Sequence, residues 1–494
     1  MNAAPRFAIA AIQFFERDVR LRMPFRFGVV TLTAAPQVFA RATITLPDGR
    51  QAQGAAAELL APKWFDKNPA LSNDDNFEQL RTSLRLSRDA YWSGEPASAF
   101  GHFERHYERH VERCAAAGLN ALIAGYGPAL IDRAVLDALC RALNSSFYQA
   151  VQRNLVGLVP SPLFADLAEF DLTGFLTGLQ PSRTIAARHT VGLVDPITSA
   201  DQETRVGDGL PETLEEVVAR YGHRWFKLKV AGDVRADIER LTAIAGVLDA
   251  ISAPYRASLD GNEQYDDVDG VIELMHRMAA EPRLARLASS VVFIEQPIKR
   301  QNALIRDISA LAIMKPVIID ESDDSFGAFP RACDLGYVGV SSKTCKGFYK
   351  SLVNRARCEM RNRTEGIVQS FAGFESGMNG RYFMSAEDLT IQAGLALQQD
   401  LALVSLLGIT HVERNGHHYV NGMADLPVGE QQDFLAAHPD LYERTHHATR
   451  VAIHDGALSI GSLDTVGFAS GAGPDWQSMR PMPAAAKSAA KLAR

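Results

Sequence analysis

The sequence predicts an α/β protein in which a (β/α)8-type barrel follows an N-terminal α+β domain. The chain has 494 residues, more than one compact core usually holds. Strand-like segments come before helical ones in residues 1–155, which is typical of an α+β domain. Short apolar runs then alternate with amphipathic segments over residues 180–425, which is the pattern of a parallel barrel.

Residues 1–155 are expected to form strands first and helices afterwards. The runs 7–22 and 37–59 are strand-like, and Asp48-Gly49 within the second run is a strong signal for a hairpin turn. Apolar residues then recur at helical spacing in three segments, 76–92, 100–118 and 128–151. This order indicates a separate α+β domain in front of the barrel.

Residues 180–425 carry eight strand-like runs, most of them separated by amphipathic segments. The runs are 184–193, 224–230, 256–262, 291–297, 316–320, 338–343, 366–373 and 400–406. A doubly wound sheet is the alternative, but eight such units in a row favour closure into a barrel. No Gly-x-Gly-x-x-Gly follows any of these runs, so nothing supports a dinucleotide-binding crevice.

The last part of the chain breaks this alternation. Residues 426–470 include a hairpin-like stretch with Asp455-Gly456 at its turn, and we expect this segment to return to the N-terminal domain. Residues 471–494 end in an Ala/Lys-rich stretch without an aromatic anchor, so we expect a disordered tail.

Composition and charge indicate which kinds of molecule this protein binds. The net charge of −7 argues against nucleic acid and anionic membranes, and no run reaches the ~20 apolar residues of a membrane span. The five cysteines are widely spaced without a Cys-x-x-Cys pair, which argues against a disulfide framework or a zinc site and fits a reducing compartment. The apolar N-terminal run reads as a strand rather than a signal peptide. We therefore expect a cytoplasmic protein that acts on a small molecule.

Acidic residues close three successive strand-like runs: Asp260, Glu295 and Asp320. The carboxyl ends of neighbouring barrel strands lie close together, so these side chains should converge. Each residue alone reads more readily as a helix cap or a solvated loop residue, but three in succession are hard to explain that way. Three ionised carboxylates need a cation, and hard oxygen ligands suit Mg²⁺, with Mn²⁺ as an alternative.

Lysines stand on either side of the predicted metal. Lys227 and Lys229 alternate along one strand and so share a face, and Lys343 ends a strand on the other side of the metal. Lys229 and Lys343 would flank a bound ligand, and repulsion between ammonium groups favours a neutral lysine that can act as a base. The alternative is a surface lysine pair on an edge strand. Lys346 competes with Lys343 but lies beyond the strand.

The histidines are expected to be structural or solvated. His189, at the end of the first barrel run, could line the pocket, but a hydrogen-bonded structural role is the better reading. His417 and His418 lie in a polar stretch that should be in contact with water.

Together these segments resemble the enolase superfamily, and within it the mandelate racemase/muconate lactonizing enzyme family, in its muconate-lactonizing-enzyme-like subgroup. The matching pieces are "KLK", "DGN", "IEQP", "IDES", "SSK" and "FESG", in that order and on the expected strands. The N-terminal "PFRFG" and "GAAAEL" are similar to mobile loops of that family's capping domain. Any one of these pieces is weak evidence, but the ordered set covers most of the chain and is specific.

The resemblance implies a role for each matching residue. Asp260, Glu295 and Asp320 would bind the metal, and Lys229 and Lys343 would be the bases on the two faces of the substrate. Three further residues would bind the substrate: Lys227, Arg26 and Glu375. Asn262 and Glu321 would support the metal ligands from behind. Lys227 would also lower the pKa of its neighbour.

The resemblance implies an enzyme that removes a proton α to a carboxylate and forms a metal-stabilised enediolate. Racemisation or epimerisation, cycloisomerisation and o-succinylbenzoate-synthase-like syn-elimination all use these parts, so isomerase and lyase readings stay open. Residues 400–402, Asp-Leu-Ala, depart from the Asp-x-Asp that dipeptide epimerases of the family carry at the eighth strand. The rival reading is a non-catalytic relative that binds a metal and a metabolite. In either case we expect a small carboxylate as partner and a homo-oligomer.

Overall fold

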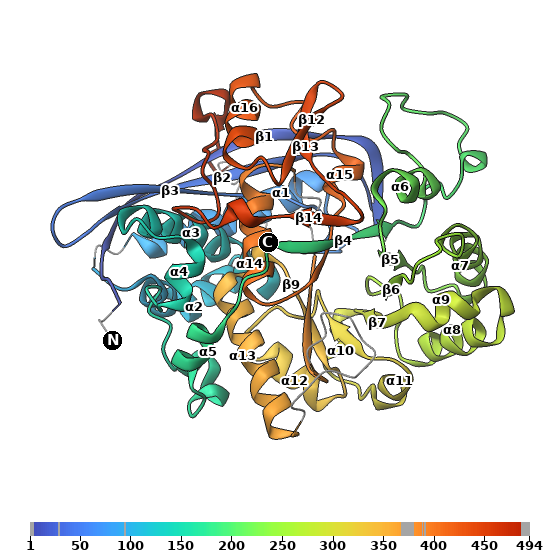
Figure 1. Cartoon of the computed structure of the whole chain (residues 1–494). Helices are drawn as coiled ribbons and strands as arrows, with labels where there is room; N and C mark the ends of the chain where they lie inside the picture. The colour runs from blue at the N-terminus through green and yellow to red at the C-terminus, as the bar shows by residue number, and fades with distance from the viewer. Residues whose placement is uncertain are drawn as a thin grey trace, which may run out of the picture.

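The structure is a computed structural model that describes residues 4–27, 30–92, 95–366, 380–387, 389 and 392–485. It confirms the predicted fold class, a barrel of parallel strands and an N-terminal α+β domain (Figure 1). Within these ranges no helix has the length and apolar character that crossing a bilayer requires.

The N-terminal domain is an antiparallel sheet covered by helices. The strands are β1 (Ala8–Phe27), β2 (Val30–Thr45) and β3 (Gln51–Leu59), and the helices are α1 (Asn73–Tyr91), α2 (Ala99–Ala116), α3 (Ala121–Ala142) and α4 (Phe147–Gln152). Gly54 allows α3 to lie directly on β3, because an added Cβ would stand 2.2 Å from the backbone nitrogen of Ala138. The β1–β2 ribbon extends past the sheet, and its far end reaches the barrel.

Eight parallel strands form the barrel, and consecutive strands are neighbours. They are β4 (Thr184–Val191), β5 (Trp225–Lys229), β6 (Arg256–Asp260), β7 (Val291–Glu295), β8 (Val317–Ile319), β9 (Gly339–Ser342), β10 (Phe383–Ala386) and β11 (His411–Glu413). β11 pairs with β4, so β10 and β11 are the two edge strands of this sheet. These two strands contact each other, but no β-ladder joins them in the described ranges. Arg188 of β4 crosses the interior and donates to the Ser385 hydroxyl and the Ala386 carbonyl of β10.

Helices on the outside connect these strands. They are α5 (Leu172–Gly178), α6 (Leu214–Tyr221), α7 (Val234–Leu248), α8 (Asp269–Ala280), α9 (Ala285–Ser290), α10 (Arg300–Ala303), α11 (Ser309–Met314), α12 (Ala328–Asp334), α13 (Phe348–Thr364) and α14 (Leu395–Leu406). Three of them, α5, α6 and α7, begin with a side-chain cap; the Asp233 carboxylate, for example, accepts from two backbone N–H groups at the start of α7.

The structure corrects the last predicted barrel strand. The predicted seventh run, 366–373, lies outside the described residues except for Gly366, and among the described residues β10 pairs with β9 in the seventh position. The predicted eighth run, 400–406, belongs to helix α14, and β11 takes the eighth position. Every residue of α14 is buried, and a short apolar run that is buried on all sides has no periodicity to separate a helix from a strand.

The chain after the barrel packs first on the barrel and then on the N-terminal domain. It contains α15 (Gly416–Tyr419), α16 (Val428–Ala437), β12 (Tyr442–Thr445), β13 (Ala448–Val451), β14 (Ala457–Ser459) and β15 (Arg480–Pro481). β12 and β13 form a hairpin, whereas β14 joins β4 of the barrel, so the hairpin expected around Asp455-Gly456 is only a tight turn. Figure 1 shows this segment beside the N-terminal strands.

The predicted disordered tail is wrong for residues 471–485. β15 pairs with β1, and Trp476 packs on Phe15 with 5.2 Å between the ring centroids. An aromatic anchor therefore precedes the Ala/Lys-rich stretch. Residues 486–494 lie outside the described ranges.

Candidate active site

A small pocket lies between the carboxyl ends of the barrel strands and two segments of the N-terminal domain. The N-terminal domain contributes Phe25, near the end of β1, and Ala61 and Trp64, which follow β3. The barrel contributes Lys229, Asn262, Lys343, Glu387, Leu389, Glu413 and Asn415. Barrels of this class carry their active sites at this end, so this pocket is the candidate active site.

Lys227 lies below the pocket at the centre of four carboxylates. Its Nζ is 2.8 Å from Asp260 Oδ2, 3.0 Å from Glu295 Oε2 and 3.0 Å from Glu413 Oε2. A fourth contact, of 2.5 Å, joins it to Glu387 Oε1. Strand ends from five positions around the barrel thus meet at one ammonium group.

This environment keeps Lys227 charged. Burial alone disfavours the ammonium form, but the carboxylates of Asp260, Glu295 and Glu413 outweigh burial and raise the pKa of Lys227 above its usual range. The side chain is fully buried and does not line the pocket, because it sits two positions deeper along β5 than Lys229. The predicted contact of Lys227 with a substrate carboxylate is therefore not part of this arrangement.

Glu295 is the carboxylate that is hardest to ionise here. Burial is the main cause that raises the pKa of Glu295 to about 7. The charge of Lys227 lowers this pKa, and the negative charges of Asp260 and Asp320 raise it further. The Oε1 atom of Glu295 is buried and makes no hydrogen bond within the described part of the chain. At Asp260, by contrast, Lys227 and Lys229 outweigh burial and lower the pKa. Glu295 thus offers an unused ligand atom.

The donor set fits a hard divalent cation. One oxygen each from Asp260, Glu295 and Glu387 lie within 4.8 Å of one another. Mg²⁺ prefers such oxygen ligands, and the Oε1 atom of Glu295 would gain the partner that the protein does not supply. These carboxylates have the ligand chemistry of the predicted Mg²⁺, or Mn²⁺, and in this structure Lys227 Nζ contacts all three of them.

Asp320, the third predicted ligand, lies beside this cluster with both oxygens occupied. Its Oδ2 accepts from Lys343 Nζ at 2.8 Å and its Oδ1 from Lys346 Nζ at 3.1 Å. These ammonium groups outweigh the effect of burial and lower the pKa of Asp320. Lys343 also contacts Glu387, so a metal bound by Asp320 would take a place that Lys343 now holds.

Lys229 and Lys343 reach the pocket from opposite sides of the barrel. Three strands separate β5 from β9 in the ring of eight. Lys229 Nζ lies 2.5 Å from Asp260 Oδ2, and Lys343 Nζ lies 4.3 Å from the centre of the Trp64 ring. Lys346 does not line this pocket, because it donates to Asp320 and to the Ser341 carbonyl. The geometry therefore favours Lys343 over Lys346 as the second base.

Asn262 and Glu321 support the carboxylates from behind. The backbone N–H of Asn262 donates to Asp260 Oδ1 at 2.8 Å, and its side-chain amide donates to Glu321 Oε1 at 3.3 Å. Lys67 of the N-terminal domain donates to the Asn262 carbonyl at 2.8 Å. Gly261 permits this tight connection, because a Cβ there would stand 2.5 Å from the Cα of Pro297.

Arg300 fixes the segment that carries Trp64. Its guanidinium donates to the Trp64 carbonyl at 2.9 Å and to the Phe65 carbonyl at 3.0 Å. The same group pairs with Glu263, which follows β6. Arg300 follows β7, so these bonds connect the part of the pocket wall that comes from the N-terminal domain to the carboxyl ends of the barrel strands.

Two site residues escaped the sequence reasoning, Glu387 and Glu413. Glu387 follows β10 and Glu413 ends β11, two short strands that the predicted seventh and eighth runs did not include. A signal was present, since the short apolar runs "YFMSA" and "ITHV" each end at a glutamate, as the earlier barrel strands end at acidic residues.

Arg26, a predicted substrate contact, is not brought to the pocket. Arg26 is exposed, and its neighbour Phe25 takes the inward position because successive strand residues face opposite ways. Glu375 lies outside the described residues, so its predicted role stays a prediction.

Comparisons with known proteins agree with this geometry. The family described as enolase C-terminal domain-like matches residues 209–364. A muconate lactonizing enzyme from Pseudomonas fluorescens, solved with muconolactone, is 16% identical at a TM-score of 0.57 and covers 95% of this chain and 97% of its own. A dipeptide epimerase from Enterococcus faecalis, solved with Mg and L-Leu-L-Tyr, is 14% identical at a TM-score of 0.56, with 94% and 99% covered.

A mandelate racemase/muconate lactonizing protein from Herpetosiphon aurantiacus is 16% identical at a TM-score of 0.56, with 94% of this chain and 98% of its own covered. A search of curated proteins gives no match. The family match thus covers the first part of the barrel, and the likeness to the solved structures shows a shared two-domain fold of N-terminal domain and barrel.

Proposed function

We propose that this protein is a Mg²⁺-dependent isomerase or lyase that removes a proton α to a substrate carboxylate. The observation that carries the proposal is the placement of Lys229 and Lys343 on opposite sides of one pocket, above the carboxylates of Asp260, Glu295 and Glu387. One lysine on each face of a bound ligand allows one of them to take a proton from the α-carbon and the other to return a proton on the opposite face.

Asp260, Glu295 and Glu387 would hold the metal, with Asp320 able to join them if Lys343 moves. Bound there, Mg²⁺ supplies positive charge beside the substrate carboxylate and so lowers the energy of the enediolate. Lys229 or Lys343, in its neutral form, takes the α-proton from its own face. The lysine on the other face, as an ammonium, can return a proton or stabilise negative charge.

Several outcomes of this chemistry remain open. Two-sided protonation gives racemisation or epimerisation, whereas loss of a leaving group or ring chemistry gives syn-elimination or cycloisomerisation. A dipeptide substrate gains no support, because the eighth strand has His-Val-Glu at 411–413 rather than Asp-x-Asp. The argument from residues 400–402 falls away, since they lie in α14. The alternative function is binding of a metal and a metabolite without turnover.

Exchange of the α-proton tests the proposal without knowledge of the product. The protein is incubated with Mg²⁺ and a panel of small carboxylic acids in D₂O, and deuterium at the α-carbon is followed by NMR. Exchange with at least one acid is expected. Tight Mg²⁺ binding without exchange for any acid would favour the binding function.

Replacement of the two lysines tests their assignment. Lys229→Ala and Lys343→Ala should each lower the exchange rate by about 10²–10⁴-fold, which is the usual contribution of a general base. Lys299→Ala is the matched control, because Lys299 is an exposed lysine that pairs with Asp266 on the surface. Exchange that proceeds at the normal rate in both active-site variants would contradict the assignment.

A further inference from the structure

Three histidines from separate segments meet on the outside of the barrel, away from the carboxylates. His189 is on β4, His223 immediately precedes β5, and His417 is in α15. Their neighbours on β4 explain the location: Arg188 and Thr190 point into the barrel, so His189 points outward. The expectation that His417 is solvated is wrong, because both of its ring nitrogens are buried.

The three rings form a nearly equilateral triangle. The ring centroids are 5.3 Å apart for His189 and His223, 5.4 Å for His189 and His417, and 5.3 Å for His223 and His417. One nitrogen from each ring lies within 4.8 Å of the other two. In a tetrahedral zinc site, with Zn–N distances of about 2.0–2.1 Å, the ring centres are also roughly 5 Å apart.

Each ring of this cluster has a buried nitrogen that no close hydrogen bond within the described ranges occupies. His189 is 2% exposed and His223 is fully buried, and neither His189 Nδ1 nor His223 Nε2 makes a hydrogen bond there. Both nitrogens of His417 are buried, and the Arg414 backbone is the nearest acceptor to that ring. Buried polar atoms normally find partners, so three neighbouring rings with unused nitrogens call for a ligand.

The tautomer of His223 is fixed in the form that binds metals. Its Nδ1 lies 2.8 Å from the Ala187 carbonyl, which can only accept, so Nδ1 carries the proton and donates. The lone pair of Nε2 is therefore free. Metal-binding histidines typically donate their other ring N–H to a carbonyl or carboxylate in this way.

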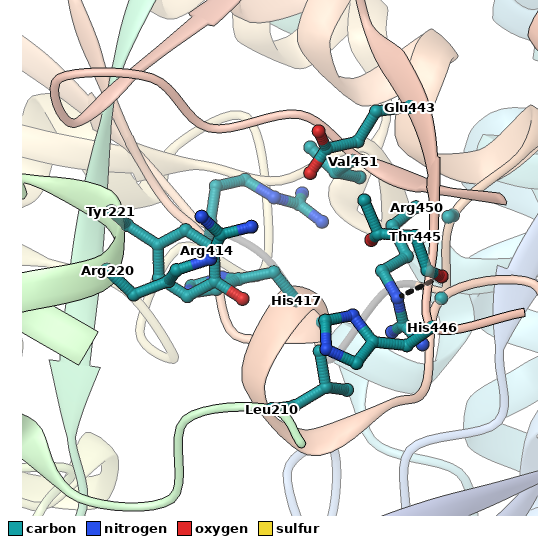
Figure 2. A pocket seen from close by; sticks show the side chains of 13 residues that line it. Leu210, Arg220, Tyr221, Arg414, His417, Glu443, Thr445, His446, Arg450 and Val451 are labelled. Atoms are coloured by element: carbon teal, nitrogen blue, oxygen red, sulfur yellow. Dashed lines mark hydrogen bonds between the residues drawn. The ribbon is translucent and has the colours of Figure 1, made fainter. Parts of the chain in front are cut away.

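A pocket beside His417 gives access to the cluster. Figure 2 shows His417 on the pocket wall with Tyr221, Arg414 and Glu443. Arg220 and Arg450 also line the pocket, so its field favours an anionic group over a second cation. A fourth metal ligand such as hydroxide or a carboxylate would fit this side.

We propose that His189, His223 and His417 bind a zinc ion, with the fourth coordination position facing the pocket beside His417. Imidazole ligands select Zn²⁺ and its d-block neighbours rather than Mg²⁺, which prefers oxygen. The site therefore differs in ligand chemistry from the carboxylate cluster inside the barrel. It would join β4, the segment before β5 and the helix after β11, and so fasten the two barrel strands that flank β4.

Metal binding by the full-length chain, without a polyhistidine tag, tests the site. Zn²⁺ is titrated against a chromophoric chelator in a large excess of Mg²⁺, so that the barrel carboxylates are already occupied. One equivalent of Zn²⁺ should bind. Co²⁺ in its place should give the intense visible bands of tetrahedral coordination, whereas the carboxylates would give weak octahedral bands.

Variants locate the ion. His223→Gln and His417→Gln should each weaken Zn²⁺ binding at least tenfold and abolish the Co²⁺ bands. His446→Gln should leave both unchanged, because His446 lines the same pocket outside the cluster. The proposal is overturned if the unmodified chain binds no Zn²⁺, or if Co²⁺ bound to it shows only octahedral bands. Neither measurement needs a variant. Zn²⁺ affinity that is unchanged in both folded histidine variants overturns it as well.

Discussion

At the scale of single residues, Lys227 shows how one buried charge can organise four others. Four carboxylates within 3.0 Å of one Nζ could not all remain ionised without it. In the metal-free protein this lysine balances the charge of the carboxylates that would bind a metal. The role of Lys227 is thus mainly structural. It affects the reaction only indirectly, because its charge helps to keep the carboxylates ionised.

Removal of this charge should destabilise the metal-free protein. For Lys227→Met we expect a loss of about 3–5 kcal/mol in the free energy of unfolding, since buried carboxylates lose their counter-charge. Added Mg²⁺ should restore part of it. Denaturant unfolding with and without Mg²⁺ measures both effects, and Lys299→Met, at an exposed pair worth less than about 1 kcal/mol, is the control. Equal stability of the two variants without metal would contradict this role.

Glu295 gives the site a pH dependence. Its pKa of about 7 in the folded, metal-free protein means that it is protonated below pH 7, and a metal ligand must be deprotonated. Mg²⁺ binding should therefore release roughly one proton at pH 6 and almost none at pH 8, so that apparent affinity rises with pH up to about 7. Calorimetry in buffers of different ionisation enthalpy counts these protons. A release that does not change between the two pH values would argue against this assignment.

The sequence identified most of the residues at the site but not their grouping. Asp260, Glu295, Lys229 and Lys343 stand where the ends of short apolar runs predicted them, because the ends of parallel strands meet by geometry. Lys343 and Lys346 each pair with one oxygen of Asp320. This arrangement depends on side-chain packing, which the spacing of residues in the sequence does not predict.

At the scale of elements, the segment that follows β3 is held in place by one side chain. Arg300→Ala should free residues 61–67 and so displace Trp64 from Lys343. We expect the KM of the exchange substrate to rise roughly tenfold, equal to about 1.4 kcal/mol of binding energy, with a smaller change in kcat. Independently of any substrate, amide hydrogen exchange in residues 61–67 should become faster.

Arg306→Ala is the matched control for this element, because Arg306 is an exposed arginine nearby in sequence whose pair with Asp267 spans 3.9 Å. Unchanged hydrogen exchange in residues 61–67 of the Arg300 variant would show that other contacts hold the segment.

Element prediction missed β10 and β11. Both are short, and in place of β11 the prediction took the longer apolar run that forms α14. The hairpin of β2 and β3 with its Asp48-Gly49 turn was predictable because local turn chemistry determines it.

At the scale of the whole molecule, the last described residues secure the first strand. Arg480 pairs with Asp18, and Arg41 lies 5.0 Å from the centre of the Trp476 ring. A chain that ends at residue 474 should lose about 2 kcal/mol or more of stability, because it lacks β15 and this aromatic anchor. Thermal unfolding against a chain that ends at residue 485, which keeps every described contact, measures the loss. Equal melting temperatures would contradict it.

The pairing of β15 with β1 also has a consequence for biosynthesis. The first strand leaves the ribosome hundreds of residues before the two that cover its outer edge. Throughout translation that edge exposes unpaired backbone groups on which other nascent chains could add strands. Arg17, Asp18 and Arg20 place charged side chains along β1, and charge on an edge strand disfavours such pairing.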